Sequence, residues 1–257
     1  TYTPYTITKK MASRPRADSS VPRLKTAPSS DEREKGWSTS VSGNRFPVRS
    51  LDYKKKKKKE NSLEAFYECI FFDRIFTRER VRKASDIWAI DKICEEPNAT
   101  RVVPQYIVLH SQLPLSKPKM MGQSTNGPSI QTCTVFKLRE ETCEVLNSKD
   151  HRSWSAALRL FVEWSKRAPR DSKWKGRLKL IMFAENPVEV GMPKMLTGYN
   201  GKPILLTKST ELFAEKNYFE ISTNFAKFCY LFRQAWSSYG IPALKTGDVS
   251  VGLTIEG

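Results

Sequence analysis

Apolar residues recur along most of the chain with the two-residue period of β-strands rather than the longer period of helices. Runs rich in aromatic and β-branched residues, such as "FYECIFFDRIF" and "QTCTVFKL", are typical of strands. The run "QYIVLHSQLP" is continuously apolar in its middle, which predicts a strand covered on both faces. The pattern predicts strands at residues 46–53, 66–76, 105–114, 131–138, 176–186, 202–206, 217–223 and 248–257.

The strand at 217–223 gives the sharpest prediction of which side chains face inward. Period two puts Phe219 and Ile221 on one face of the strand, and Tyr218 and Glu220 on the other. We therefore predict that Phe219 and Ile221 face the core and that Tyr218 and Glu220 face solvent. A buried and paired Glu220 would instead make it the first credible functional residue of the chain.

Three segments carry apolar residues at the three- and four-residue spacing of amphipathic helices. The clearest has Trp154, Leu158, Phe161 and Ser165 on one face. The predicted helices are residues 80–96, 153–168 and 225–240.

Strands outnumber helices here and lack the regular strand–helix–strand rhythm of a doubly wound fold. We therefore predict an α+β fold, a single domain around a mainly antiparallel β-sheet with a few packed helices. Residues 1–36 are basic, rich in Ser and Pro and almost without large aliphatic side chains, so we expect this segment to be disordered. The domain then occupies residues 37–257. Because the first methionine is Met11, we expect either a fragment or a start at that residue.

The chain carries 44 Lys and Arg against 27 Asp and Glu, a formal net charge of +17. Such an excess favours polyanionic partners, namely nucleic acid or an anionic membrane surface. No apolar run approaches the roughly 20 residues that a membrane-spanning helix needs. The five cysteines include no CxxC pair, so we expect reduced thiols and a cytoplasmic location.

The sequence offers little for catalysis. The two histidines, His110 and His151, have no neighbouring nucleophile or carboxylate pattern that would indicate a catalytic group. The phrase "GYNGKP" lacks the first glycine and the hydroxyl of a phosphate-binding loop and is better explained as a turn. We predict no catalytic residue, no metal site, no cofactor and a protein that is not an enzyme.

Basic residues concentrate in two places. Six consecutive lysines follow the first predicted strand, and residues 166–179 hold seven basic residues against Asp171, with Trp174 among them. Such a segment suits phospholipid headgroups, but it equally suits single-stranded nucleic acid, and a plain solvated loop is the third interpretation. Alternation within 176–186 predicts that Arg177 and Lys179 face outward. The candidate lipid- or anion-binding residues are Lys54, Lys55, Lys56, Lys57, Lys58, Lys59, Lys166, Arg167, Arg170, Lys173, Trp174, Lys175, Arg177 and Lys179.

Several phrases, taken in order, resemble one family. "WSTSVSGNRFPVRSLDYKKKKKK", "FFDRIF", "GRLKLIMFAEN", "GYNGKPILL", "KNYFEIST" and "GDVSVGLTIEG" are similar to successive motifs in the carboxy-terminal domain of the plant protein enhanced disease resistance two. The resemblance spans roughly residues 37–257. One departure is that Ser222, Thr223 and Asn224 stand where the family usually has an aspartate. The family domain continues beyond its last strand, so the resemblance implies a truncation at Gly257.

In plant relatives this domain follows a pleckstrin homology domain and a START lipid-binding domain, so the resemblance implies work at membranes and transfers no catalytic residue. It also implies that the lysines form a basic loop inside the domain rather than a tail. We therefore predict a non-enzymatic regulatory domain, peripheral to membranes, that engages anionic phospholipid through basic loops. The alternative is a nucleic-acid-binding or nuclear-targeted basic protein, because phosphate backbones and import receptors also accept lysine runs.

Overall fold

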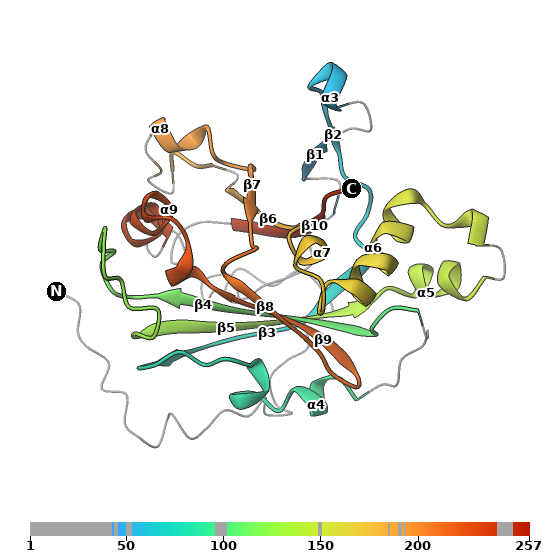
Figure 1. Ribbon diagram of the computed structural model, residues 1–257, viewed down its shortest axis with the longest axis horizontal. Helices are drawn as coiled ribbons and strands as arrows, with labels where there is room; N and C mark the ends of the chain where they lie inside the picture. The colour runs from blue at the N-terminus through green and yellow to red at the C-terminus, as the bar shows by residue number, and fades with distance from the viewer. Residues whose placement is uncertain are drawn as a thin grey trace.

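A computed structural model describes residues 43, 46–49, 53–95, 102–148, 151–184, 186–189, 192, 194–240 and 249–257 (Figure 1). The predicted disorder of residues 1–36 lies outside these residues. Within them, ten strands form three sheets. The strands are β1 (Pro47–Arg49), β2 (Lys59–Asn61), β3 (Tyr67–Thr77), β4 (Tyr106–Pro114), β5 (Ser129–Leu138), β6 (Leu178–Ala184), β7 (Pro203–Leu205), β8 (Thr210–Ala214), β9 (Tyr218–Asn224) and β10 (Val249–Ile255).

The largest sheet has the strand order β3-β5-β4-β9-β8. All of its neighbouring pairs are antiparallel except β4 and β9, which run parallel in the middle of the sheet. A second sheet has the order β10-β6-β7, and β1 pairs with β2 in a small hairpin, again with antiparallel pairing throughout. The predicted α+β fold around a mainly antiparallel sheet is therefore confirmed.

Helical segments are short, with one exception. α6 is a true amphipathic helix, which begins where the Ser155 hydroxyl accepts a hydrogen bond from the Leu158 amide and ends in the basic pair Lys166 and Arg167. The helical segments are α3 (Tyr53–Lys56), η2 (Ala84–Asp86), α4 (Ile90–Ile93), α5 (Glu140–Asn147), η3 (His151–Ser153), α6 (Ala156–Arg167), α7 (Ser172–Lys175), α8 (Lys194–Thr197), η4 (Phe225–Lys227), α9 (Tyr230–Ala235) and the π-helical turn η5 (Trp236–Gly240).

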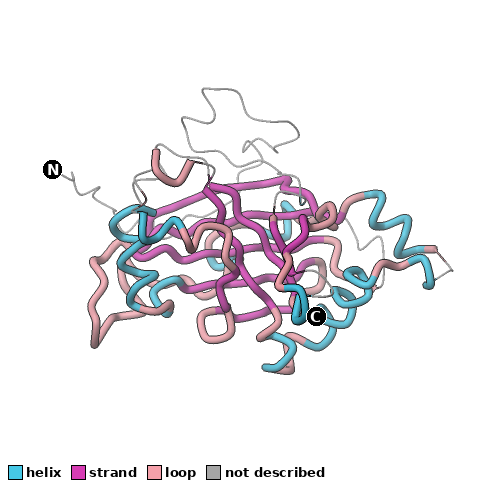
Figure 2. The backbone as a smooth tube through the Cα atoms, turned by 90° about the horizontal axis from the view of Figure 1, so that it is seen from above, coloured by secondary structure: helices cyan, strands magenta, loops and turns pink. Residues whose placement is uncertain are grey.

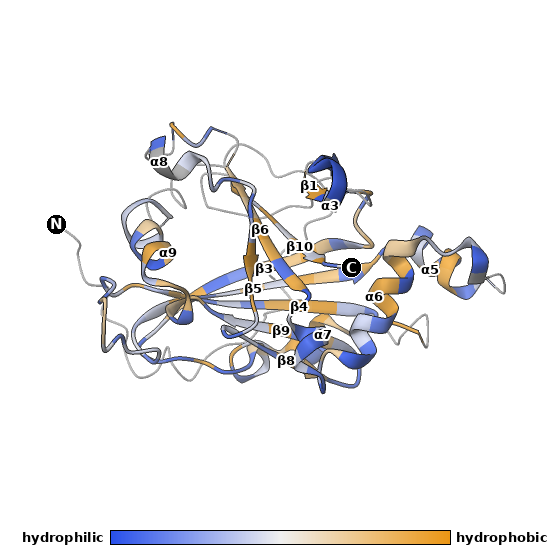
Figure 3. Ribbon diagram, turned by 45° about the horizontal axis from the view of Figure 1, so that its top comes forward, coloured by the Kyte–Doolittle hydropathy of each residue, from blue (hydrophilic) through white to orange (hydrophobic). Residues whose placement is uncertain are grey.

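The large sheet separates two cores. On one face, β6, β10 and α6 lie over the sheet, and a cluster that includes Leu109, Trp164, Leu180 and Phe219 fills the space between them (Figures 1 and 2). On the other face, η2 and α4 cover the sheet with a smaller cluster that includes Trp88. Because both faces are covered, β4 is buried along its length up to its last residue, as its continuous apolar pattern predicts. Apolar colouring marks β4, β6 and β10, whereas α3 is strongly hydrophilic (Figure 3).

Two predicted helices are broken in the structure. The described part of this range, residues 80–95, forms only η2 and α4 as helical turns, and Asp91, expected on the inner face, is exposed. The buried residues of this segment would spread more than half-way round a continuous helix, so two short turns with a break between them bury them better. Residues 225–240 are divided into η4, α9 and η5, because the Asn224 side chain caps η4 and Phe228 then returns to an extended conformation.

Candidate functional site

The second face of β9 holds two side chains, Tyr218 and Glu220, that the sequence pattern places in solvent. Period two is obeyed, since Phe219 and Ile221 belong to the larger core, whereas Tyr218 and Glu220 point to the opposite face. That face is covered by the segment around η2, so Tyr218 is buried and Glu220 is 0% exposed. The prediction that Tyr218 and Glu220 face solvent is wrong. Which segment covers a face of a sheet depends on residues that are distant in sequence from the strand.

This covered face changes from apolar to polar along the strands. On β4, Tyr106 and Val108 are followed on the same face by His110 and Gln112. The parallel register places Ser222 beside His110. The polar end forms a buried polar row of Thr77, His110, Gln112, Ser129, Gln131, Glu220, Ser222 and Asn224. Buried polar groups are costly unless they are hydrogen-bonded, so the partners of this row determine what it can do.

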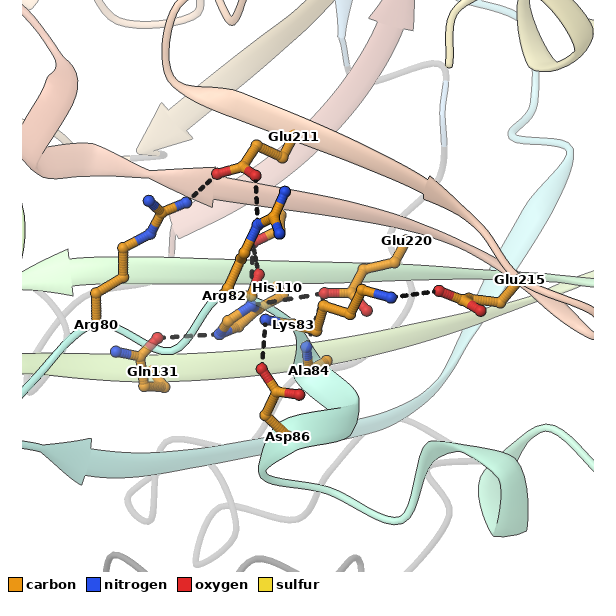
Figure 4. A network of polar contacts seen from close by, with 11 residues as sticks. Arg80, Arg82, Lys83, Ala84, Asp86, His110, Gln131, Glu211, Glu215 and Glu220 are labelled. Atoms are coloured by element: carbon orange, nitrogen blue, oxygen red, sulfur yellow. Dashed lines mark hydrogen bonds and ion pairs between the residues drawn. The ribbon is translucent and has the colours of Figure 1, made fainter. Parts of the chain in front are cut away.

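The two carboxylate oxygens of Glu220 differ in their contacts (Figure 4). Its Oε1 atom accepts a hydrogen bond of 2.7 Å from the amide of Ala84, the first residue of η2. Among the described residues, its Oε2 atom has no hydrogen-bond partner. Burial raises the pKa of Glu220 to about 7, although the Ala84 amide opposes the shift. The side chain is therefore close to half-protonated at neutral pH.

His110 lies beside this carboxyl and is 1% exposed. Its Nε2 atom is 2.9 Å from Oε1 of Gln131. The Gln131 amide nitrogen donates to Thr77 and Ser129, so its oxygen faces the ring and His110 carries its hydrogen on Nε2. Burial lowers the pKa of His110 to about 4, so the ring is neutral at physiological pH.

The remaining ring nitrogen of His110 faces two oxygens. Nδ1 lies 3.2 Å from the Ser222 hydroxyl and 3.7 Å from Oε1 of Glu220. The Ser222 hydroxyl donates its hydrogen to the backbone oxygen of Arg82 at the shorter distance of 2.8 Å. Glu220 and His110 therefore form a buried acid–imidazole pair whose members lie side by side, at a separation longer than a hydrogen bond.

Ion pairs at the edge of the row tie residues 80–86, the covering segment around η2, to β8. Arg80 and Arg82 both pair with Glu211, and the Arg82 contact measures 2.8 Å. Partial burial opposes ionisation of Glu211, but the hydrogen bonds from Arg82 and Arg80 outweigh it and lower the pKa of this carboxyl. Lys83 pairs with Glu215 at 2.7 Å. The covering segment is thus fixed in two places. The Ala84 amide binds Glu220, and the ion pairs with Glu211 and Glu215 hold the segment at the β8 edge.

This buried pair is enclosed rather than open to solvent. Both side chains lie between the sheet and the covering segment. In the part of the chain that is described, no group of three or more His, Cys, Asp or Glu is arranged to hold a metal ion. None of the five cysteines, all within the described residues, forms a disulfide.

The lysine run lies on a folded hairpin rather than in a loop. β1 and β2 pair from Pro47↔Asn61 to Arg49↔Lys59, and α3 closes the turn between them. Lys57 has a positive φ of 53°, which lets the chain reverse after α3. The Arg49 guanidinium lies 4.9 Å and the Lys57 ammonium 5.8 Å from the centre of the Tyr53 ring. We call residues 47–61 the lysine hairpin; Lys55, Lys56, Lys57, Lys58 and Lys59 are exposed on it, and the side chain of Lys54 lies outside the described residues.

The second basic group is the basic helix end, residues 166–177, formed by the last turn of α6 and by α7. Trp174 is half-buried against the larger core, and the guanidinium groups of Arg167 and Arg177 lie 5.0 Å and 4.3 Å from its ring centre. Its ring is therefore already engaged in cation–π contacts. Four members of this group are exposed, namely Lys166, Arg167, Arg170 and Lys173, and two are half-buried, namely Lys175 and Arg177.

Lys179 does not belong to this surface. The prediction that it faces outward is wrong, since it is buried and donates a 2.6 Å hydrogen bond to the backbone oxygen of Gly176. Its ammonium also lies 3.5 Å from Glu256, which in addition pairs with Arg49 of the lysine hairpin. Glu256 therefore links the base of the lysine hairpin to the strand that follows the basic helix end.

A model of the family described as protein enhanced disease resistance 2, C-terminal, matches residues 37–257. The chain belongs to this family, as the ordered motifs of its sequence predict. No curated protein and no solved structure matched the chain. In the described part of the chain, no helix has both the length and the apolar character that crossing a bilayer requires.

Sequence reasoning found the basic residues and missed the buried pair. Neither Glu220 nor His110 belongs to a recognisable motif, because their partners come from segments remote in the chain: Ala84 lies 136 residues before Glu220. One signal was available. A strand predicted to be covered on both faces has no solvent side, so His110 within it had to be a buried polar group.

Proposed function

We propose that this domain is a non-enzymatic, cytoplasmic peripheral membrane module that binds anionic phospholipid headgroups through the lysine hairpin and the basic helix end. The observation that carries the proposal is the exposure of Lys55–Lys59 on a hairpin of defined structure. A basic residue near an anionic leaflet is worth about 1 kcal/mol, so five together give strong attraction without a pocket.

The anchoring of the hairpin supports this role. A β-carbon on Gly252 of β10 would lie 3.0 Å from the Phe46 ring, so Phe46 packs closely on that glycine at the base of the hairpin. Arg49 adds the ion pair with Glu256. A fixed array of charges loses less conformational entropy on binding than a disordered tail would. The hairpin therefore presents its lysines to a surface at a small ordering cost.

The absence of catalysis is part of the same proposal. Its support is that Glu220 and His110, two ionisable groups with strongly shifted pKa values, are enclosed; Glu220 is bonded to the covering segment, and His110 is bonded to side chains of the sheet. Perturbed pKa values mark functional sites best when the groups also line a cleft. A buried pair in which Glu220 fastens the covering segment to the sheet explains these residues without a substrate.

Vesicle sedimentation with the whole chain tests the proposal. We expect binding to phosphatidylcholine vesicles that contain phosphatidylserine and little binding to phosphatidylcholine alone, with steep loss as salt rises. Replacing Lys55, Lys56, Lys57 and Lys58 with Gln should weaken binding by roughly a hundredfold or more. The matched control replaces four exposed lysines elsewhere, which gives the same change in net charge: Lys92, Lys202, Lys208 and Lys216. Equal losses in both variants would show that net charge alone is responsible and would overturn the assignment to the hairpin.

RNA is the competitor in this assay, because lysines also attract phosphate backbones. The arrangement around Trp174 favours lipid over RNA, since Arg167 and Arg177 already occupy its ring and reduce the surface on which a base would stack. We expect phosphatidylserine vesicles to be bound in the presence of equimolar single-stranded RNA at physiological salt. Displacement from the vesicles by RNA under those conditions would contradict the proposal and favour the nucleic-acid function.

A further inference from the structure

The connection between β4 and β5, residues 115–128, carries the most exposed apolar side chains of the described chain. Met120 is 77% exposed and Met121 is 86% exposed at the tip of this loop. Gly122 follows with a positive φ of 66°, which makes the turn at the tip possible. Large apolar side chains that protrude this far are unusual on a domain with two well-filled cores, and a contiguous exposed apolar patch marks an interaction site.

The body of the loop is held firmly, so the exposure of its tip is a built feature. The Gln123 side-chain oxygen accepts hydrogen bonds from the Lys119 amide at 2.7 Å and from Arg233 at 2.8 Å. Arg233 also donates to the backbone oxygen of Lys119. Further along, Asn224 of β9 donates to the backbone oxygen of Thr125. The loop is thus bonded on both sides of the methionines.

Arg233 joins the loop to α9, and the loop and helix lie side by side in Figure 1. Arg233 is buried, whereas the first residues of α9 are not: Tyr230 is 38% exposed and Leu231 is 51% exposed. On its inner side α9 packs Phe232 against Phe228, the residue that follows η4, and the two ring centres lie 4.6 Å apart. The helix therefore presents apolar residues outward on the same edge as the methionines. We call residues 115–128 together with Tyr230 and Leu231 the methionine edge.

The two chain segments that contribute to the methionine edge carry charge of one sign. Lys117, Lys119 and Lys227 are exposed, and neither residues 115–128 nor residues 225–240 contain an Asp or Glu. Apolar side chains that protrude between lysines match the boundary of an anionic bilayer, where acyl chains lie just beneath negative headgroups. A protein partner fits this edge less well. A stable protein interface needs about 800 Å² from each partner, and two protruding methionines on a convex tip offer far less.

We propose that the methionine edge inserts into anionic membranes, with Met120 and Met121 entering the acyl boundary and Lys117, Lys119 and Lys227 contacting the headgroups. This inference rests on the proposed function in taking an anionic membrane as the partner, but it uses different residues. Methionine suits the role because its flexible side chain adapts to an irregular environment. The tip adds apolar transfer to an attraction that would otherwise be purely electrostatic.

The apolar and the electrostatic contributions to membrane binding can be distinguished by their response to salt. Replacing Met120 and Met121 with Ser in the whole chain should weaken binding to phosphatidylserine-containing vesicles roughly tenfold to a hundredfold, by a similar factor at low and at high salt. The lysine-hairpin variant should lose its effect as salt rises, because screening removes the charge attraction. Val188→Ser is the control, since it removes an exposed apolar side chain outside the methionine edge.

A fluorescent label gives the direct test. The environment-sensitive dye NBD is attached through Met121→Cys, in a chain that also carries Cys229→Ser and Cys143→Ser at its exposed and half-buried cysteines. Its fluorescence emission should shift to the blue and brighten on phosphatidylserine-containing vesicles. The same label at position 188 should stay in water. Three outcomes would overturn the inference. If the chain binds vesicles while the label at 121 stays in water, the inference falls and the proposed function stands. If the chain binds no anionic vesicle, both fall. If the chain self-associates and the Met120 and Met121 substitutions abolish this, the edge joins two copies of the chain instead.

Discussion

Replacing Glu220 and His110 with Gln, one at a time, should change the pH dependence of stability in opposite directions. In the unfolded chain the Glu220 carboxyl regains its ordinary pKa of 4.5, whereas burial raises the folded-state pKa to about 7. Folding is therefore favoured while the carboxyl is protonated, and stability is lost as pH rises from 4.5 to 7. The His110 pKa is 6.5 when unfolded and about 4 when folded. Its contribution has the opposite sign, since stability is lost as pH falls from 6.5 to 4.

In the native protein these two slopes cancel over much of their range. Each group changes the free energy of unfolding by about 1.4 kcal/mol per pH unit within its window, one downward and one upward. Between pH 4.5 and 6.5 the windows overlap, so the pair contributes almost no pH dependence. Removing one member exposes the other. The Glu220→Gln chain should gain about 3 kcal/mol between pH 4 and 6.5, and the His110→Gln chain should lose about 3 kcal/mol between pH 4.5 and 7.

Urea unfolding followed by tryptophan fluorescence, measured at intervals from pH 4 to pH 8, checks this directly. Trp88 is a suitable reporter, because it is buried and its ring centre lies 6.0 Å from that of His110. Each variant is compared with the native chain at the same pH, which removes the contribution of all other groups. Glu215→Gln controls for loss of a carboxylate from the same network, since Glu215 pairs with Lys83 at the edge of the row. Equal slopes in all chains, or a His110→Gln chain that gains stability with pH, would refute the opposite pKa shifts of Glu220 and His110.

Three further predictions follow from the packing. Phe219→Ala leaves a cavity beside Trp164, 5.4 Å away between ring centres, and should cost about 3–5 kcal/mol in the free energy of unfolding at neutral pH; a loss below about 1 kcal/mol would mean that Phe219 is not a core residue. Arg233→Met removes the donor to Gln123 and to the backbone oxygen of Lys119, so hydrogen exchange of the loop amides should speed up while the rest of the chain keeps its protection; unchanged loop protection would show that other bonds hold it. Gly252→Val places side-chain atoms against the Phe46 ring, so trypsin should cut within Lys55–Lys59 faster than in the native chain; equal cleavage rates would mean that Phe46 does not anchor the hairpin.

The strands could be predicted because local pattern decides them. Alternation fixed the positions of most strands and the facing of Phe219 and Ile221, since a period of two depends only on neighbouring residues. The α6 face was predictable for the same reason, and Leu158, Phe161 and Ser165 are all buried on it. Family membership was also predictable from ordered motifs. The strands and the helix face share one property, that their evidence lies within a few residues, whereas the family assignment needs only the order of short motifs along the chain.

What covers each face was not predictable, because it depends on contacts between remote segments. Glu220 has the pattern of a solvent-facing residue until Ala84 and the segment around it are placed over β9. Lys179 likewise alternates with apolar residues, yet it is buried, and its ammonium has partners in the Gly176 carbonyl and Glu256. The hairpin was missed for another reason. Its reversal uses a positive φ at Lys57, and lysine carries none of the turn signal of glycine or asparagine.

The parallel pairing of β4 with β9 also determines how this domain can be made. His110 and Ser222, neighbours in that pairing, are 112 residues apart in the chain. On the ribosome, β3, β4 and β5 are therefore synthesised long before β9. During that time the apolar edge of β4 that pairs with β9 stays unpaired. An unpaired apolar edge invites pairing with other chains, and long-range parallel pairing is slow. We expect nascent chains that end before Tyr218 to bind holdase chaperones and to aggregate when released, and chains that extend past Asn224 to escape both. Ribosome-profiling of chaperone-bound nascent chains would detect that release point.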